Sequence, residues 1–244
     1  MIANPESTRA GLPKEVPSSA HYSIARDNAD RDAAFRLVYD NYVAKGLIQP
    51  NPSRLRTTDY HLLPTTTIFN AMRAGRVICT MTLVGDAQLG LPMECIYPAE
   101  VKEARVRGLY VGEVCALAVT DVALRTFMPI FVELTRLMTQ FARASGMDQL
   151  LIAVHPKHAW FYQRLMGFEQ IGGLKEYPDL QNAPAVACRL DFARADRERP
   201  PCYDRVFGVP LPESKLESFV MTNGKREVCD DTVDVCEQDL LVTA

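Results

Sequence analysis

The sequence lacks the features that would place the protein in a membrane or on nucleic acid. Its 244 residues contain no apolar stretch approaching the roughly 20 residues that cross a bilayer, and the first 19 contain no apolar core of signal-peptide length. A net charge of −3 with 23% charged residues is not the balance of a nucleic-acid-binding protein. We therefore expect a cytoplasmic protein with no transmembrane segment and no nucleic-acid partner.

The sequence also lacks a metal-binding cysteine pattern. None of the seven cysteines forms a Cys-x-x-Cys pair, and the three nearest the C-terminus have no histidine close to them. Four others lie in apolar or strand-like surroundings, where a reduced thiol packs as a small hydrophobe: Cys79, Cys95, Cys115 and Cys188. The pattern predicts neither a metal centre nor a permanently bound cofactor.

Glycine is missing from residues 120–130 (TDVALRTFMPI), which join a predicted strand to a predicted helix. Closely spaced glycines in such a loop let successive backbone N–H groups converge on a phosphate at the helix start. Without them, tight binding of a nucleotide-type donor at this loop is not expected.

The chain length suits one domain with a well-buried core. We expect residues 1–19 to form a disordered arm, residues 20–192 to form the domain, and residues 193–244 to form a partly disordered extension with at most a short helix at 213–220. A proline-rich loop at 49–64 has no consistent period, and long loops in compact domains are usually functional.

Hydrophobic periodicity and turn residues predict the elements of this domain. Strands are expected at 22–25, at 65–73 and 76–84 as a hairpin, and at 110–119, 149–154, 168–171 and 185–191. Helices are expected around 35–46 and at 99–106, 129–145 and 156–167, with Gly167 ending the last. The sum is a mixed α/β (α+β) sheet of six or seven strands with helices on both faces.

The segment from residue 112 to 172 combines GEVCALAV, LLIAV and HPKHAWFYQRLMGFEQIG. In this order the three pieces resemble the acyl-CoA-binding half of GNAT-type acyltransferases. The alternative for the last piece is that Phe161 and Phe168 are core aromatics around a helix end. Consistent strand and helix signals on both sides favour the acyltransferase interpretation.

A narrower resemblance covers residues 22–192. FRLVYDNYVAKGLIQP, GRVICTMTLVGDAQLGLPMEC and GEVCALAVT are similar to N-acyl amino acid synthases of the FeeM type, which are relatives of the acyl-homoserine-lactone (autoinducer) synthases. This resemblance implies a GNAT-like sheet splayed at its centre. It also implies a transferase that moves a medium or long fatty acyl chain from the phosphopantetheine of acyl carrier protein to the amine of an amino acid or similar small acceptor.

A carrier-protein donor requires no loop for the phosphates of CoA, which agrees with the missing glycines. Two other functions stay open: an acyl-CoA-dependent GNAT acetyltransferase, and a catalytically degenerate protein that binds an acylated carrier or a lipid. The strand motif of the FeeM type usually reads Glu, an aliphatic residue, Ser, Arg, Leu, Ala, Val. This chain keeps the glutamate as Glu113 but has Cys115 and Ala116 for Ser-Arg, so it must use another cation or accept a different amine.

Glu113 is the candidate general base, because a carboxylate inside an apolar strand is costly unless it is paired or working. Strict alternation places it on one face with Cys115, Leu117 and Val119. The alternative is a glutamate at the wet end of the strand, paired with Arg105 or Arg107. The resemblance further implies a strand bulge that frees backbone N–H groups for the oxyanion at three residues: Leu117, Ala118 and Val119.

Tyr162 occupies the place of a tyrosine that meets the departing sulfur in many GNAT-type enzymes, and a phenol is able to donate a hydrogen bond there. The alternative is a core tyrosine near Leu165 and Met166. His155 precedes Pro156 and is placed to cap a helix, while His158 is expected to be solvated, although either is also a candidate for catalysis.

Two further sets follow from the expected donor. Acyl carrier protein is acidic, so cations on two helices are candidates for docking it: Arg136, Arg143, Lys157 and Arg164. The alternative is that they belong to ordinary solvated helix faces. Apolar residues beside the splayed strands are candidates for the acyl-chain pocket: Met81, Leu83, Phe131 and Met138.

Overall fold

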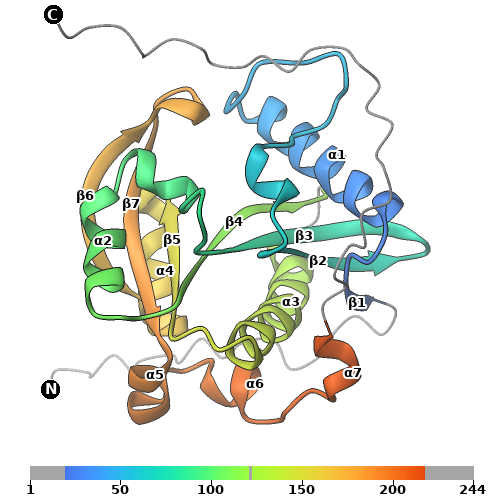
Figure 1. Cartoon of the computed structure of the whole chain (residues 1–244). Helices are drawn as coiled ribbons and strands as arrows, with labels where there is room; N and C mark the ends of the chain where they lie inside the picture. Colours follow the sequence, from blue (N-terminus) through green and yellow to red (C-terminus); the bar gives the residue numbers. More distant parts are fainter. Residues whose placement is uncertain (1–19, 121–122, 218–244) are drawn as a thin grey trace, which may run out of the picture.

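The computed structural model describes residues 20–120 and 123–217. They form a seven-stranded sheet in the order β1-β2-β3-β4-β5-β7-β6 (Figure 1). The strands are β1 (His21–Ile24), β2 (Thr66–Arg73), β3 (Arg76–Gly85), β4 (Val111–Val119), β5 (Gln149–Val154), β6 (Glu169–Tyr177) and β7 (Ala183–Asp191). β4 and β5 are parallel and the other neighbours are antiparallel, which confirms the predicted mixed sheet.

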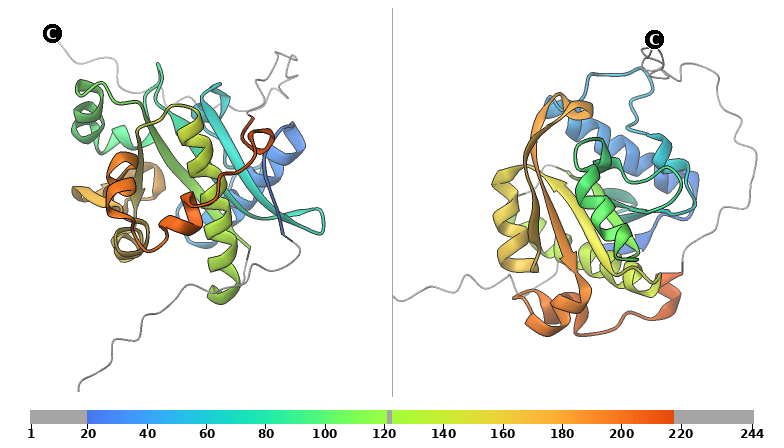
Figure 2. Two further views of the ribbon diagram at one scale, coloured as in Figure 1. Left: turned by 90° about the horizontal axis from the view of Figure 1, so that it is seen from below. Right: turned by 60° about the vertical axis from the view of Figure 1, so that its left-hand side comes forward.

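Helices cover both faces of the sheet, as the sequence predicts (Figure 2). One face carries α1 (Asn28–Ala44) and α2 (Pro98–Val106), together with the short 3₁₀ helices η1 (Asp59–Leu62) and η2 (Pro92–Cys95). The other face carries α3 (Leu124–Ala144) and α4 (Pro156–Met166). A third 3₁₀ helix, η3 (Pro178–Leu180), lies between β6 and β7. We call these two faces the α1 face and the α3 face.

The sheet opens in its middle. β4 and β5 pair only through Val111 with Gln149, Gly112 with Leu150, and Glu113 with Leu151. Beyond this point β4 continues along β3, and β5 continues along β7, so the two halves diverge (Figure 1). The predicted splay is confirmed, and it begins at Glu113.

A β-bulge in β4 lies just beyond the opening. Thr82 pairs with Cys115 and Thr80 pairs with Ala118, so Ala116 and Leu117 of β4 together lie opposite one residue of β3. Ala116 has a φ of 52°, in the left-handed region that non-glycine residues rarely adopt. One extra residue in a strand reverses the faces of all residues that follow it.

The bulge therefore corrects the prediction of strict alternation. Glu113 and Cys115 lie on the α1 face, where Cys115 packs against the apolar cluster that includes residues of α2 and η2. Leu117 and Val119 pack instead against the cluster beneath α3. The prediction that all four residues share one face was wrong, because the sequence gives no sign of a bulge at an alanine.

Two other predicted bounds change. α3 begins at Leu124 rather than at residue 129, because Phe127 and Met128 pack against the core and hold the helix despite Pro129 inside it. β6 runs to Tyr177, well past residue 171, and its pairing with β7 shifts register twice on the way. These shifts hide the period-two pattern by which strands are recognised.

Residues 192–216 hold more structure than expected. They form α5 (Phe192–Glu198), α6 (Tyr203–Phe207) and α7 (Glu213–Leu216), and α6 and α7 contact the outer side of α3. The arm at 1–19 and the end of the extension lie outside the described residues. In the part of the chain that is described, no helix is both long and apolar enough to cross a membrane.

Candidate active site

Glu113 lies at the point where the sheet opens and is 2% exposed. Its Oε2 accepts a hydrogen bond of 2.7 Å from the backbone N–H of Met93 in η2. No residue within 20–120 or 123–217 hydrogen-bonds to its Oε1. Burial raises the pKa of Glu113 to about 8; the charge of Glu94 adds to this rise, and the Met93 N–H opposes it.

The alternative position for Glu113, at a wet strand end in a salt bridge, is wrong. Arg105 pairs with Asp86 and Glu94 at 2.6 and 2.5 Å, and Arg107 lies 3.8 Å from Glu103. A buried carboxyl with a raised pKa and an unused oxygen has the properties of a general base for neutral to alkaline pH.

A network of hydrogen bonds fixes the turn that contacts Glu113. Arg105 donates to both carboxylate oxygens of Asp86 and to both of Glu94, at 2.5–2.7 Å. Glu94 Oε1 also accepts from the backbone N–H of Leu91 at 2.7 Å. On the other side of the turn, the Tyr177 hydroxyl donates to the carbonyl of Pro92 at 3.0 Å. The Met93 N–H is thereby held in position against Glu113.

Three tyrosines lie on the same side of the sheet as Glu113, each from a different element: Tyr42 of α1, Tyr60 of η1 and Tyr177 of β6. Burial raises the pKa of all three hydroxyls, and the Glu113 carboxylate contributes to each rise. They therefore remain neutral phenols at physiological pH and are able to donate or accept hydrogen bonds. A substrate bound at Glu113 on the α1 side of the sheet would thus meet polar but uncharged groups.

Sequence reasoning missed these tyrosines, as well as Arg56, whose charge lowers the pKa of the Cys115 thiol and of the Tyr42 hydroxyl against the larger effect of burial. Tyr60 and Arg56 both belong to the 49–64 loop, which was expected to be functional without any particular residue being named. The only sequence signal for these residues was the length of the 49–64 loop and its lack of periodicity. Tyr60 of this loop packs against the same apolar cluster as Cys115 of β4, more than 50 positions later in the sequence, and no local pattern shows this.

The bulge governs the candidate oxyanion donors. Of the three predicted residues, Leu117 lies in the bulge itself, while Ala118 is in register with Thr80 of β3. The N–H of Val119 donates to Oδ1 of Asn41 in α1 at 3.4 Å. Leu117 is accordingly the one of the three that a strand irregularity releases from the ladder, and it stays our candidate.

Tyr162 lies on the α3 face, so it is not beside Glu113. Its ring contacts Phe131, Phe161 and Phe168 at centroid distances of 6.2, 5.5 and 5.5 Å. Burial raises the pKa of its hydroxyl to about 12. No residue in the described ranges hydrogen-bonds to that hydroxyl. The two candidate catalytic groups, Glu113 and Tyr162, thus lie on opposite faces of the sheet. The sheet is open between β4 and β5.

Several basic residues lie near the open ends of β4 and β5. His155, directly after β5, caps α4 by accepting from the N–H of Lys157 at 3.2 Å. His158 is exposed, and partial burial lowers its pKa, with further contributions from Lys157, His155 and Lys45. We call Lys45 and Lys157 the rim cations. Arg164 is exposed farther along α4.

Arg136 and Arg143 are not on an open helix face. Arg136 donates to the carbonyl of Val209 at 2.8 Å. Arg143 pairs with Asp196 at 2.6 Å, and its guanidinium lies over the rings of Phe192 and Phe207 at 4.8 and 4.3 Å. Both arginines bind the C-terminal segment of the chain itself, so we remove them from the candidate carrier-docking set.

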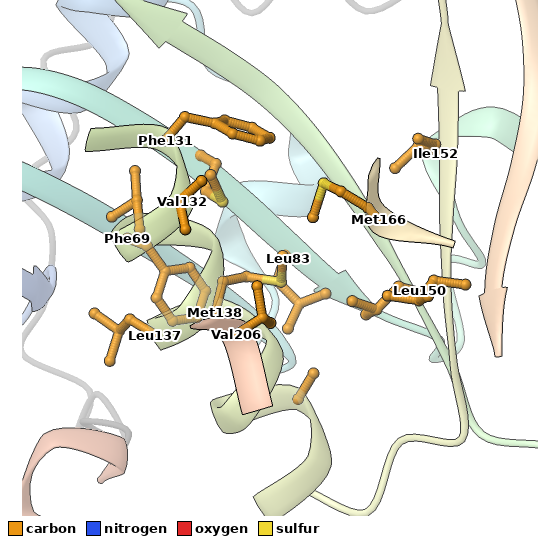
Figure 3. Packing of buried hydrophobic residues seen from close by; sticks show 14 of the residues in the cluster. Phe69, Leu83, Phe131, Val132, Leu137, Met138, Leu150, Ile152, Met166 and Val206 are labelled. Carbon is orange, nitrogen blue, oxygen red and sulfur yellow. The ribbon is translucent and has the colours of Figure 1, made fainter. Parts of the chain in front are cut away.

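The four candidates for the acyl-chain pocket lie in one layer between α3 and the sheet. Met81 and Leu83 come from β3, and Phe131 and Met138 come from α3; none is more than 4% exposed. Figure 3 shows Leu83, Phe131 and Met138 in the same apolar cluster as Met166 of α4. This layer is tightly packed, so an acyl chain would enter it only as flexible side chains move aside.

Two other features were compared with the surroundings of Glu113: a surface cavity and possible metal-binding clusters. A cavity of about 410 Å³ lies between β1 and α7 and is lined by none of the residues around Glu113. In the portion of the chain with described coordinates, no group of three or more His, Cys, Asp or Glu side chains is arranged to hold a metal ion.

Comparisons with known proteins agree with this geometry. The family model for the N-acyl amino acid synthase FeeM matches residues 33–191. The solved structure of FeeM, an N-acyl amino acid synthase from uncultured soil microbes, is 30% identical; the match covers 71% of this chain and 90% of that one, with a TM-score of 0.62. A search of curated proteins gave no match.

Two acyl-homoserine lactone synthases share the fold at lower identity. The CoA-dependent synthase BjaI is 20% identical with a TM-score of 0.54, over 79% of this chain and 90% of that one. The synthase LasI is 11% identical with a TM-score of 0.57, over 79% and 96%. The fold is thus GNAT-like, and the chain belongs to the FeeM family of N-acyl amino acid synthases, which makes it an N-acyltransferase.

Proposed function

We propose that the protein transfers a medium or long acyl chain from the phosphopantetheine thioester of acyl carrier protein to the amine of an amino acid. The observation that carries this proposal is the opening of the sheet beside Glu113, a buried carboxyl with one oxygen free of protein partners. An extended thioester arm is narrow enough to lie between diverging strands, where its carbonyl would come close to this carboxyl.

The reaction needs three groups in this order. The acceptor reacts as the free amine: its nitrogen attacks the thioester carbonyl, and Glu113 takes the proton that the nitrogen loses as the C–N bond forms. The developing oxyanion accepts hydrogen bonds from the bulge of β4, with Leu117 as the candidate donor. When the C–S bond breaks, the thiolate leaves with an amide formed behind it, and Tyr162 donates a hydrogen bond to the sulfur.

The ionisation of each group suits its role. A carboxyl with a pKa of about 8 is a stronger base than an ordinary glutamate and is still ionised in part near neutrality. A phenol with a pKa of about 12 keeps its proton and so acts as a hydrogen-bond donor rather than as an acid. The thiolate is then protonated from solvent or from the carboxyl that received the amine proton.

The donor is inferred from the entrance to the split. The segment before α3 has no glycine with which to cradle a pyrophosphate, whereas the rim cations offer positive charge beside the ends of β4 and β5, and Arg164 adds another farther along α4. An acidic carrier protein complements such a rim, and the phosphodiester of its prosthetic group needs only one or two cations. A cytoplasmic location is consistent with this partner.

The test compares donors directly. The purified chain is incubated with long-chain acyl carrier protein or the matching acyl-CoA, each with a panel of amino acids, and N-acyl products are identified by mass spectrometry. We expect the kcat/KM for acyl carrier protein to be at least about tenfold higher than that for acyl-CoA. Equal or better use of CoA would favour a CoA-dependent transferase, and no product from either donor would favour a protein that binds the acylated carrier without catalysis.

A matched pair of variants locates the entrance. Lys157→Glu, on the rim, is expected to raise the KM for acyl carrier protein about tenfold, because it reverses one charge in a steered encounter. Lys102→Glu, an exposed lysine of α2 on the α1 face, is the control and should leave the KM unchanged. Equal effects of both would mean that docking depends on net charge alone.

A further inference from the structure

The cavity between β1 and α7 lies at the free edge of the sheet. β1 is the first strand in the sheet order and pairs only with β2. The cavity of about 410 Å³ is lined by all of β1, by Met72 of β2, and by Ser214 and Lys215 of α7. Figure 1 shows α7 next to β1, on the opposite side of the molecule from β6. Its volume falls within the range of small-molecule pockets, roughly 300–1,000 Å³.

The backbone of β1 offers unpaired hydrogen-bonding groups to this cavity. Ala25, directly after β1, donates its N–H to the carbonyl of Ile68 in β2 at 2.9 Å. In an antiparallel pair, residues bonded to the partner strand alternate with residues whose N–H and C=O groups point away from it. Ser23 therefore faces β2 as Ala25 does, whereas the backbone groups of Tyr22 and Ile24 point to the free edge. Both of these residues line the cavity, and in the described part of the chain no loop or helix backbone bonds to them.

The cavity carries more positive than negative charge. Arg26 and Lys215 line it with exposed side chains, and His21 adds an imidazole. Within the described ranges Arg26 donates only to the carbonyl of Ser214, and Lys215 has no ion pair. Asp30 is the one carboxylate in the lining, and it lies in the first turn of α1, where the helix dipole already favours a negative charge. Arg26 and Lys215 are thus available to an anion.

The rest of the lining is partly apolar, and α7 closes the outer side. Ile24 is buried in the cluster beneath α3, and Met72 is half-buried. The hydrogen bond of 3.2 Å from Arg26 to the Ser214 carbonyl holds α7 beside β1, and Leu216 packs against the same cluster. Because α7 covers the strand edge, the remaining space suits a small molecule rather than an added peptide strand.

We propose that this cavity is a second binding site, which takes a small amphipathic carboxylate. The carboxylate lies at Arg26 and Lys215, where charge-assisted hydrogen bonds are strong, and the apolar chain lies against Ile24 and Met72. Two sources share this chemistry, a free fatty acid and an N-acyl amino acid. The second also has an amide group that the free edge of β1 is able to bind. The inference stands apart from the donor proposed above, because none of the residues around Glu113 lines the cavity.

Photoaffinity labelling of the full-length protein tests this site. Three probes carry the same photoreactive group on the same acyl or alkyl chain: decanoic acid, N-decanoylglycine, and decyl alcohol, which lacks the carboxylate. Mass spectrometry of the labelled peptides separates this cavity from the apolar layer between α3 and the sheet. Both acids should label residues 21–26, Met72 or residues 214–215. The alcohol should label them at least about tenfold less, the effect of losing a charged hydrogen bond.

Lys215→Glu reverses a cation that has no ion pair in the described ranges, so the fold should persist. Labelling of the cavity by both acids should fall about tenfold, with labelling beneath α3 unchanged. Lys102→Glu, at an exposed position of α2, is the matched control and should label as the wild type does.

The probes also identify the source of the ligand. Stronger labelling by N-decanoylglycine indicates an N-acyl amino acid, stronger labelling by decanoic acid indicates a free fatty acid, and equal labelling supports the carboxylate chemistry that they share. Labelling by the alcohol at the level of the acids, or cavity labelling that Lys215→Glu leaves unchanged, overturns the inference. Labelling confined to the layer beneath α3 overturns it as well and leaves the proposed function standing, whereas cavity labelling of a chain without transferase activity does the reverse.

Discussion

The backbone N–H of Met93 lies 2.7 Å from Oε2 of Glu113, so a short turn on the α1 face directly contacts the carboxyl in the centre of the sheet. This hydrogen bond occupies one carboxylate oxygen and leaves the other for a substrate. It also favours the ionised form of a group that burial keeps protonated to about pH 8.

Replacing Glu113 by Gln removes the proposed base while keeping an oxygen that accepts the Met93 N–H. We expect kcat to fall about 10²- to 10⁴-fold, the usual contribution of a positioned general base, with the fold intact by circular dichroism. Glu176→Gln, at an exposed position of β6, is the control and should retain full activity. Wild-type turnover in Glu113→Gln would show that another group takes the proton.

The pH dependence of the wild-type enzyme should follow the ionisation of Glu113. Because the base must be deprotonated and burial raises its pKa to about 8, kcat/KM should rise with pH and level off above pH 8. Measurements at constant ionic strength between pH 5.5 and 9.5 would determine this limb. If kcat/KM instead rises around pH 4.5, the ordinary pKa of a glutamate, the carboxyl is far better solvated than its burial indicates.

Stability should also depend on pH through this carboxyl. In the folded protein Glu113 keeps its proton up to about pH 8, whereas in the unfolded chain it loses it near 4.5, so the folded state binds more protons between these values. The free energy of unfolding should therefore decline as pH rises from 4.5 to 8. Glu113→Gln lacks this decline, so urea unfolding at pH 5 and pH 9 should show the variant gaining stability relative to wild type at the higher pH.

Arg105 should influence the site from a distance, through Glu94. In Arg105→Gln the charge of Glu94 is no longer neutralised and the turn that presents Met93 loses its clamp, and both effects raise the pKa of Glu113. The acid limb of the pH profile should move to higher pH. Activity at pH 7 should fall about two- to tenfold, since one pKa unit corresponds to a tenfold change.

The control for this prediction is Arg107→Gln, because Arg107 belongs to the same segment but lies near Glu103 on the surface. Its pH profile should coincide with that of the wild type. A loss of activity in Arg105→Gln at every pH, without a shift of the acid limb, would mean that Arg105 serves stability alone.

The sequence predicted the elements wherever a local rule determines them. Ala74 and Gly75 both have positive φ and form the tight turn of the predicted β2–β3 hairpin, and Gly167 ends α4 in the left-handed conformation. Pro156 with His155 before it marked the start of that helix. Turn and cap residues act within a few positions, so their consequences can be read from the sequence.

The site was less predictable, because it depends on contacts between distant segments. Glu113 stood out as a carboxylate in an apolar strand, but its hydrogen bond comes from Met93, 20 positions earlier. The bulge at Ala116 reversed the expected face of Leu117, since alanine carries no sequence signal for a positive φ. Tyr60 lies in a loop without periodicity, and only the fold brings it to the apolar cluster that Cys115 of β4 also contacts.

Tyr162→Phe tests the proposed role of the Tyr162 hydroxyl on the α3 face. Its effect on stability should be small, because this hydroxyl has no hydrogen-bond partner in the described ranges and the phenyl ring keeps its contacts with Phe131 and Phe168. If the hydroxyl stabilises the departing thiolate, kcat should fall about 10- to 100-fold, as for other hydrogen bonds to a charged group. The measurement is steady-state turnover with the natural thioester.

A thioester with a more acidic leaving thiol separates this role from a change in packing. Such a thiolate is stable without help, so the penalty of Tyr162→Phe should shrink toward unity with an aryl thioester of the same acyl chain. A packing defect would lower turnover with both donors by the same factor. Leu165→Ala, which disturbs the same helix and leaves the hydroxyl in place, should show that uniform loss and serves as the comparison.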